Sequence, residues 1–256
     1  MKTNLLREFY KFTHRRIPLY GLLVLLGLML YTIGTSYKVT PSLITQGFGA
    51  GQWTIIIIMA ISSDMIAMEW RDHTMTTLLY KTSNKSILYL AKFIVLVVYS
   101  FILLVFGIIF SFIIKFLMVG SKYSWQDNFN GHSLINALFL NMGGTMLYLL
   151  FIISLSLMLV LLIKSNATVI MIGLAIGFFG TDLSSLAISA FSGLKSILAW
   201  NPLNMINIIT QLSNREMASI TYLTNSELII ANLVYAIIFF WIGILIFKKR
   251  AILGRE

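Results

Sequence analysis

The stretch ILYLAKFIVLVVYSFILLVFGIIFSFIIKFLMV, residues 87–119, decides the fold class of this chain. Its only charged residues are Lys92 and Lys115, one near each end. A helix needs about 20 predominantly apolar residues to cross a bilayer, and this run exceeds that length. Lys115 lies near enough to one end for its ammonium group to reach the lipid headgroups. The run therefore predicts a membrane-spanning helix.

The composition of the whole chain agrees with this prediction. Of the 256 residues, 58% are hydrophobic and only 11% are charged, against about 25% in an average soluble domain. A soluble fold could not cover so much apolar surface, whereas lipid can surround it. We predict an all-α integral membrane protein with one transmembrane domain over residues 1–256. Its six spans are expected at residues 17–37, 47–67, 87–119, 133–163, 167–191 and 228–247.

The positions of lysine and arginine predict the orientation. With the N-terminus in the cytoplasm, 14 of the 19 Lys and Arg residues fall in cytoplasmic segments, as the positive-inside rule requires. Six spans also place both termini on one side. The net charge of +10 does not indicate a nucleic-acid partner, because the basic residues cluster at the ends of apolar runs, where they face lipid headgroups.

An amphipathic helix is predicted before the first span. In residues 2–16, Leu5, Phe9 and Phe12 share one helical face, while most basic residues lie elsewhere. This pattern is typical of an interfacial helix on the inner leaflet. The alternative is a basic start that serves only to set topology.

Two further segments outside the spans are large. Residues 68–86 form the only sizeable cytoplasmic loop. Residues 192–227 contain apolar pieces that are too short to span a membrane. They favour short re-entrant helices that dip into the outer leaflet or cap the bundle, over a loose loop.

Motifs of common enzymes are missing from the sequence. It contains no G-x-x-x-x-G-K-[ST] phosphate loop, no H-E-x-x-H and no G-x-S-x-G. There are no cysteines, and the three histidines are scattered over different segments. We therefore expect no catalytic residue, no metal site and no cofactor in this chain, and we do not expect it to be an enzyme.

The span at residues 167–191 carries small residues at every fourth position, together with one acidic residue. Such spacing lets helix backbones approach closely in lipid. Packing within one chain, a subunit interface and the wall of a transport path all remain open. The carboxylate is either functional or a polar group satisfied by its neighbours. The candidate residues for a dimer seam or a path are Gly173, Gly177, Thr181, Asp182, Ser185 and Ser189.

The segment EWRDHTMTTLLYKTSNK, residues 69–85, followed by Lys92, resembles the first cytoplasmic loop of ABC transporter permeases of the type-2 export class. That loop has an acidic residue, Gly-Thr, a Leu pair, a small or Pro residue, a basic residue and a Lys at the start of the third span. His73 stands here where Gly is usual, and the Pro is missing. The matching residues are Glu69, Thr74, Leu78, Leu79, Ser83, Lys85 and Lys92.

The resemblance extends to the layout of the chain and implies a function. By resemblance, residues 68–86 would form a coupling helix that docks on a separate ATP-binding subunit, which would carry ATP and Mg. Two permease subunits would pair, as a homodimer or a related heterodimer. The residues expected at the coupling contact are Glu69, Arg71, Thr74, Leu78, Leu79 and Lys85.

The expected function is the permease subunit of an ATP-driven exporter in a bacterial plasma membrane, with both termini cytoplasmic. The low charge resembles that of Gram-positive permeases for amphipathic or antimicrobial peptides, such as bacteriocin-immunity pumps and exporters of phenol-soluble modulins. An ion-coupled secondary transporter or channel is the alternative. It predicts charge at the bilayer midplane and broken spans in symmetric halves, neither of which is clear here.

Overall fold

A computed structural model describes residues 2–72 and 84–253 of the chain. Within these residues, six helices are long and apolar enough to cross a membrane, which confirms the predicted fold class. The six helices are α2 (Ile17–Thr35), α4 (Ala50–Arg71), α6 (Lys85–Ile114), α7 (Leu134–Ile163), α8 (Asn166–Ala190) and α12 (Asn225–Leu253).

Helices α4 and α7 form the centre of the bundle. In the most apolar stretch of each of these two helices, about two thirds of the residues are buried. In α2, α8 and α12 the buried share of that stretch is roughly a quarter. Serine hydroxyls join the two central helices: Ser62 Oγ donates to Ser156 Oγ at 2.8 Å, and Ser156 Oγ donates to the carbonyl of Met59 at 3.2 Å. In a bilayer, small residues and such hydrogen bonds hold helices together, because lipid supplies no hydrophobic drive for their association.

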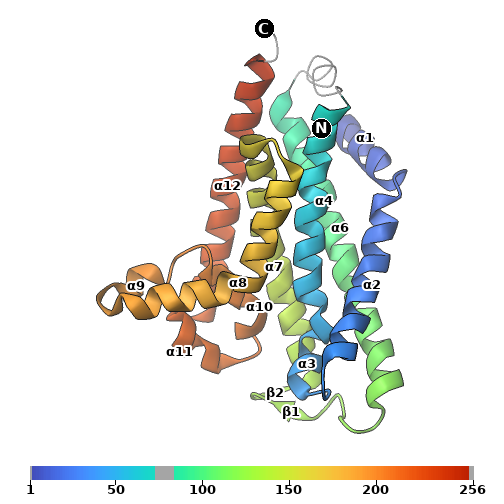
Figure 1. Cartoon of the computed structure of the whole chain (residues 1–256), viewed down its shortest axis with the longest axis vertical. Coiled ribbons are helices and arrows are strands. Elements are labelled where there is room, and N and C mark those ends of the chain that lie inside the picture. Colours follow the sequence, from blue (N-terminus) through green and yellow to red (C-terminus); the bar gives the residue numbers. More distant parts are fainter. Residues whose placement is uncertain (1, 73–83, 254–256) are drawn as a thin grey trace.

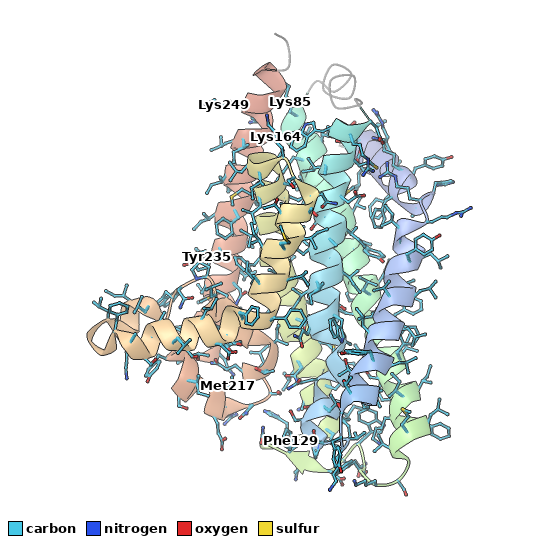
Figure 2. All side chains as sticks on the ribbon, viewed as in Figure 1. Lys85, Phe129, Lys164, Met217, Tyr235 and Lys249 are labelled. Carbon is cyan, nitrogen blue, oxygen red and sulfur yellow. The ribbon has the colours of Figure 1, made fainter. Side chains whose placement is uncertain are left out.

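The first and the last residues that the structure describes lie at the same end of the bundle (Figure 1). Lys85, Lys164 and Lys249 lie there too, whereas Phe129 and Met217 lie at the opposite end (Figure 2). We call these the terminal end and the distal end. Six long helices place the two termini together, as the sequence predicts. The helix α1 (Lys2–Thr13) packs beside α6 at the terminal end.

The second span differs from its predicted limits of residues 47–67. It is entered through α3 (Pro41–Thr45) and the turn η1 (Gly47–Gly49), in which Gly47 and Gly49 adopt φ values of 59° and 83°. This left-handed conformation favours glycine. At its other end α4 continues through Arg71, because Glu69 is bound by lysines inside the protein. The predicted loop at residues 68–86 therefore begins after the helix, and its residues 73–83 lie outside the described part.

The third span is close to its prediction. The helix α6 ends at Ile114 and continues as the π turn η2 (Lys115–Val119). Lys115 is buried, and its ammonium group lies 4.7 Å from the centre of the Trp125 ring. A short hairpin, β1 (Asn128–Phe129) and β2 (His132–Ser133), then leads into α7 at the distal end.

The segment before the last span is folded, as predicted, into short helices. They are η3 (Ser192–Leu194), α9 (Lys195–Leu198), η4 (Asn204–Asn207), α10 (Ile208–Gln211), η5 (Arg215–Met217) and α11 (Ala218–Thr221). Figure 1 shows that the last turns of α8 swing sideways from the bundle and that α9 lies on this projecting arm. The predicted fifth span, residues 167–191, therefore does not follow the bundle axis along its whole length.

Buried amides hold these short helices against one another. Asn204 Nδ2 donates to the carbonyls of Ala199 at 2.6 Å and Thr221 at 2.9 Å. Gln211 Nε2 donates to the carbonyl of Leu223 at 2.7 Å, and Asn207 Nδ2 donates to Asn204 Oδ1 at 2.9 Å. We call Asn204, Asn207 and Gln211 the amide network. Because irregular backbone must satisfy its polar groups inside the protein, these amides make the fold of the distal segment possible.

Candidate functional site

A cluster of four charged side chains joins α1, α4 and α6 at the terminal end. Lys92 Nζ lies 2.6 Å from Glu69 Oε1 and 2.9 Å from Glu8 Oε2. Lys11 Nζ lies 3.5 Å from Glu8 Oε1 and 3.6 Å from Glu69 Oε1. We call Glu8, Lys11, Glu69 and Lys92 the ion cluster. Its two carboxylates and two ammonium groups balance in charge.

The amphipathic face of α1 positions its half of the cluster. Phe12 is buried, and Leu5 and Phe9 are partly buried against the core, as the predicted apolar face requires. Glu8 lies on the same face, three residues after Leu5 and four before Phe12. The face therefore packs on the bundle, while Leu6 and Tyr10 remain exposed.

Three members of the ion cluster are almost completely buried. The side chains of Glu8, Glu69 and Lys92 are only 1–2% exposed, and that of Lys11 is 33% exposed. Burial alone would raise the pKa of Glu8, but the ammonium groups of Lys92 and Lys11 outweigh it and hold the pKa of this carboxyl below its ordinary value. Glu8 is therefore ionised at neutral pH, and each buried charge has an opposite charge beside it.

The residues predicted for the coupling contact lie in different surroundings. Glu69 is buried in the ion cluster. Arg71 is exposed and forms a surface ion pair with Asp72 at 3.8 Å, and Lys85 is half-buried at the start of α6. Thr74, Leu78 and Leu79 lie outside the described residues. Glu69 can affect a partner only through the helices that it joins, whereas Arg71 is open to direct contact.

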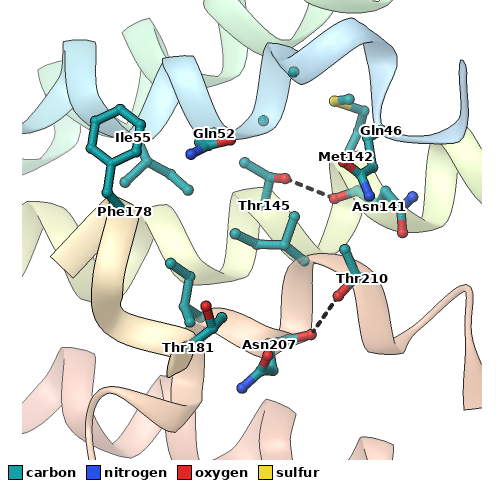
Figure 3. Close-up of a pocket in the computed structure, with 15 residues that line it drawn as sticks. Gln46, Gln52, Ile55, Asn141, Met142, Thr145, Phe178, Thr181, Asn207 and Thr210 are labelled. Atoms are coloured by element: carbon teal, nitrogen blue, oxygen red, sulfur yellow. Dashed lines mark hydrogen bonds between the residues drawn. The ribbon is translucent and has the colours of Figure 1, made fainter. Parts of the chain in front are cut away.

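A cavity of about 330 Å³ lies between α4, α7, α8 and the distal short helices (Figure 3). Gln52 and Ile55 contribute from α4, and Thr145 from α7. Gly51 keeps α4 close to α7 here, since a Cβ at this position would lie 2.7 Å from Thr145 Oγ1. The lining is a mixture of apolar, amide and hydroxyl side chains, and none of its residues is ionisable.

Two of the buried polar side chains around the cavity are satisfied by the protein itself. Asn141 Nδ2 donates to the carbonyl of Thr45 at 2.8 Å, and Asn141 Oδ1 accepts from Ser213 Oγ at 2.6 Å. Thr145 Oγ1 donates to the carbonyl of Asn141 at 2.8 Å. These contacts fix the wall that α7 contributes, so the cavity is a formed part of the fold.

The six residues predicted for a seam or path separate into three groups. Gly173 is buried against α4, where a Cβ would lie 2.6 Å from Met59 Cγ. Gly177 and Thr181 line the cavity. The remaining three, all exposed, are Asp182, Ser185 and Ser189. Packing within the chain thus accounts for Gly173, and the roles of the other five stay predictions.

Sequence reasoning missed Glu8 and the cavity amides. Glu8 is an acidic residue on the apolar face of a helix, which is a signal for a buried cationic partner. Gln52 and Asn141 are amides inside otherwise apolar spans, where polar groups are costly and mark contacts or pathways. Each signal is present in the sequence, but neither tells which distant residues complete the site.

A comparison with known families gives one match within the chain. The family described as "Protein of unknown function (DUF2705)" matches residues 12–253, which is nearly the whole chain. No curated protein matches it. The match includes the whole of α2, α4, α6, α7, α8 and α12, and leaves out Glu8 and Lys11 of the ion cluster.

Proposed function

The chain belongs to the DUF2705 family, and from the contacts of its own residues we propose that it is the membrane-spanning subunit of an ATP-driven exporter. A separate ATP-binding subunit would dock at the terminal end, on the segment between α4 and α6. The sequence has no phosphate loop of its own. An ATP-driven transporter built on this chain therefore needs such a partner, and the resemblance of residues 69–85 to a type-2 coupling loop indicates where it binds.

The observation that carries the proposal is the ion cluster at the base of that segment. Glu69 lies at the end of α4, three residues before Asp72, and Lys92 lies in the first turns of α6. Their contacts with Glu8 and Lys11 tie both helices to α1. Separating buried opposite charges is costly. A movement of the ATP-binding subunit docked between α4 and α6 would therefore shift α1, α4 and α6 together. Rigid-body movement of this kind is what a switch between two states of a bundle requires.

The cavity favours ATP as the energy source over an ion gradient. Ion-coupled carriers place ionisable side chains at the substrate site near the midplane. The residues lining this cavity are all uncharged. Among the described residues, the buried charges of the ion cluster are paired at the terminal end instead.

The proposed substrates are amphipathic or antimicrobial peptides. A cavity with both apolar and hydrogen-bonding walls suits a molecule that has both kinds of surface. The proposed complex contains two permease subunits, whose contact would use the exposed small residues of α8.

The test is affinity purification of the tagged chain from its native membranes in a mild detergent. We expect an ATP-binding subunit to co-purify and its ATP hydrolysis to change when peptide is added. The charge-reversed variant Arg71→Glu should reduce the co-purified subunit several-fold, because Arg71 is exposed beside the docking segment. The matched variant Lys38→Glu reverses an exposed charge far from that segment and should leave the complex intact.

Two results would contradict the proposed function or the proposed docking place. If no ATP-binding subunit accompanies the chain, and transport in vesicles follows a proton or sodium gradient, the ion-coupled alternative replaces it. If Arg71→Glu and Lys38→Glu retain the subunit equally, the docking place is wrong even though the partner exists.

A further inference from the structure

The cavity beside α8 has room for a ligand and has polar groups without partners. At about 30 Å³ for each water molecule, its 330 Å³ would hold roughly ten waters or a ligand of about a dozen non-hydrogen atoms. Pockets of a few hundred Å³ with mixed walls are the usual sites for small molecules. The contacts of Asn141 and Thr145 described above show that this space is bounded by fixed side chains.

Gln52 and Thr181 present the unused polar groups. Both side chains line the cavity and are exposed, and among the described residues no protein group hydrogen-bonds the amide of Gln52 or the hydroxyl of Thr181. Figure 3 shows that they extend from opposite walls, Gln52 from α4 and Thr181 from α8. An amide and a hydroxyl can each donate and accept, so together they complement a ligand that also does both.

The apolar part of the lining limits the ligand further. Ile55, Phe178 and Ile206 contribute aliphatic and aromatic surface between the polar groups. A charged ligand would lose its hydration without meeting an opposite charge, which is strongly unfavourable. The matching ligand is therefore neutral, carries at least one group that both donates and accepts hydrogen bonds, and has a branched apolar part.

We infer that the cavity binds an uncharged peptide unit, an amide-linked residue with an apolar side chain. This inference deepens the proposed function and rests on it for the identity of the peptide as a substrate. The amide of the bound unit hydrogen-bonds the exposed side chains of Gln52 and Thr181 in place of solvent, and its side chain packs on Ile55 and Phe178. The terminal charges of a peptide would stay outside the cavity.

The natural absence of cysteine makes a direct test possible. In Thr181→Cys, the introduced thiol is the only one in the chain, and its labelling rate with N-ethylmaleimide reports access to the cavity. The probe is N-acetyl-leucine amide, a neutral molecule of about a dozen non-hydrogen atoms, for which millimolar affinity is expected. At about 50 mM probe, we expect labelling to slow by about tenfold.

Three controls separate binding from general effects. Free leucine has the same side chain but two charges, and it should not protect. Ser219→Cys lies on α11, is exposed and does not line the cavity, so its labelling should not respond to the probe. Adding Gly177→Leu to Thr181→Cys fills the cavity and should abolish protection, whereas adding Gly143→Leu, at an exposed glycine with open space around it, should preserve it.

The possible outcomes support or overturn the inference separately from the proposed function. Equal protection by free leucine, or protection by glucose without protection by N-acetyl-leucine amide, would overturn the assignment to peptides. Absence of protection in a chain that does co-purify with an ATP-binding subunit overturns the cavity inference alone. Protection in a chain that has no such subunit supports the peptide site and overturns the ATP-driven mechanism.

Discussion

The two ends of this bundle are held by buried polar networks of opposite character. The terminal end uses the ion cluster, in which Lys92 contacts Glu8 and Glu69 from two other helices. The distal end uses the amide network, in which Asn204 and Gln211 bind backbone carbonyls of the same segment. One network joins separate helices through side-chain charges, and the other shapes one irregular stretch of backbone through neutral groups.

The two ends are expected to respond differently to mutation and to pH. A buried charge that loses its partner carries a large desolvation penalty, whereas an unpaired neutral amide or carbonyl costs less. Charges also respond to pH, and amides do not. The terminal end, where we propose that a partner docks, is thus the end where we expect the helices to move together and the stability to depend on protonation. The distal end is a fixed cap beside the cavity.

The largest effect is expected from Lys92→Met. It leaves two buried carboxylates with only the partly exposed Lys11 nearby, and should lower the free energy of unfolding by about 3–5 kcal/mol. Lys115→Met is the matched control on the same chain segment: Lys115 is also buried, but it contacts the face of Trp125, and its loss should cost about 2 kcal/mol or less. Titration with sodium dodecyl sulfate, followed by tryptophan fluorescence, measures both.

Equal losses of unfolding free energy in Lys92→Met and Lys115→Met would contradict the special role of the ion cluster. They would show that leaving its carboxylates without Lys92 costs no more than losing the contact between Lys115 and the Trp125 ring. A double-mutant cycle of Glu8→Gln with Lys92→Met measures how much free energy of unfolding depends on the contact between these two side chains. The coupling between the two changes should be favourable, since the second removes the charge that the first leaves without a partner.

An intermediate effect is expected from Glu8→Gln, and it should depend on pH. At pH 7 the loss of this charged contact should cost about 2–3 kcal/mol. Because its folded pKa lies below the ordinary 4.5, the contribution of Glu8 is fully present above pH 4.5 and is lost as the pH falls through the lowered pKa. The natural chain should therefore lose stability more steeply than Glu8→Gln as the pH falls below about 4.5.

The control for this pH dependence is Glu216→Gln, at an exposed residue of the distal end. Its stability should follow that of the natural chain over the whole pH range. A Glu8→Gln curve parallel to that of the natural chain would mean that the pKa of Glu8 is the same in the folded and unfolded states, and the ionic description of the terminal end would be wrong.

The smallest effect is expected from Asn204→Ala in the amide network. It removes the hydrogen bonds to Ala199 and Thr221 and should cost about 1–2 kcal/mol, with no change between pH 5 and 8. Asn136→Ala, at an exposed residue, should change stability by less than about 0.5 kcal/mol. A marked pH dependence in Asn204→Ala would contradict the neutral description of the distal end.

Much of the architecture could be predicted from the sequence. The apolar run at residues 87–119 and its five counterparts predicted the six membrane helices, because the thickness of a bilayer sets the length of a span. The periodicity of Leu5, Phe9 and Phe12 predicted the packed face of α1. Helix α4 runs about a turn past the predicted span limit, where Glu69 is buried, since hydropathy counts such a residue as exposed.

The sites could be predicted only in part. Composition, length and local pattern are enough to predict six helices that are long and apolar enough to cross a membrane and two termini at one end, and to show that the sequence has no phosphate loop. Only the tertiary structure decided that Glu8 meets Lys92, 84 residues away, and that Gln52 faces Thr181 across a cavity. Contacts between distant segments depend on how the helices pack, and local periodicity carries no information about which helix faces which.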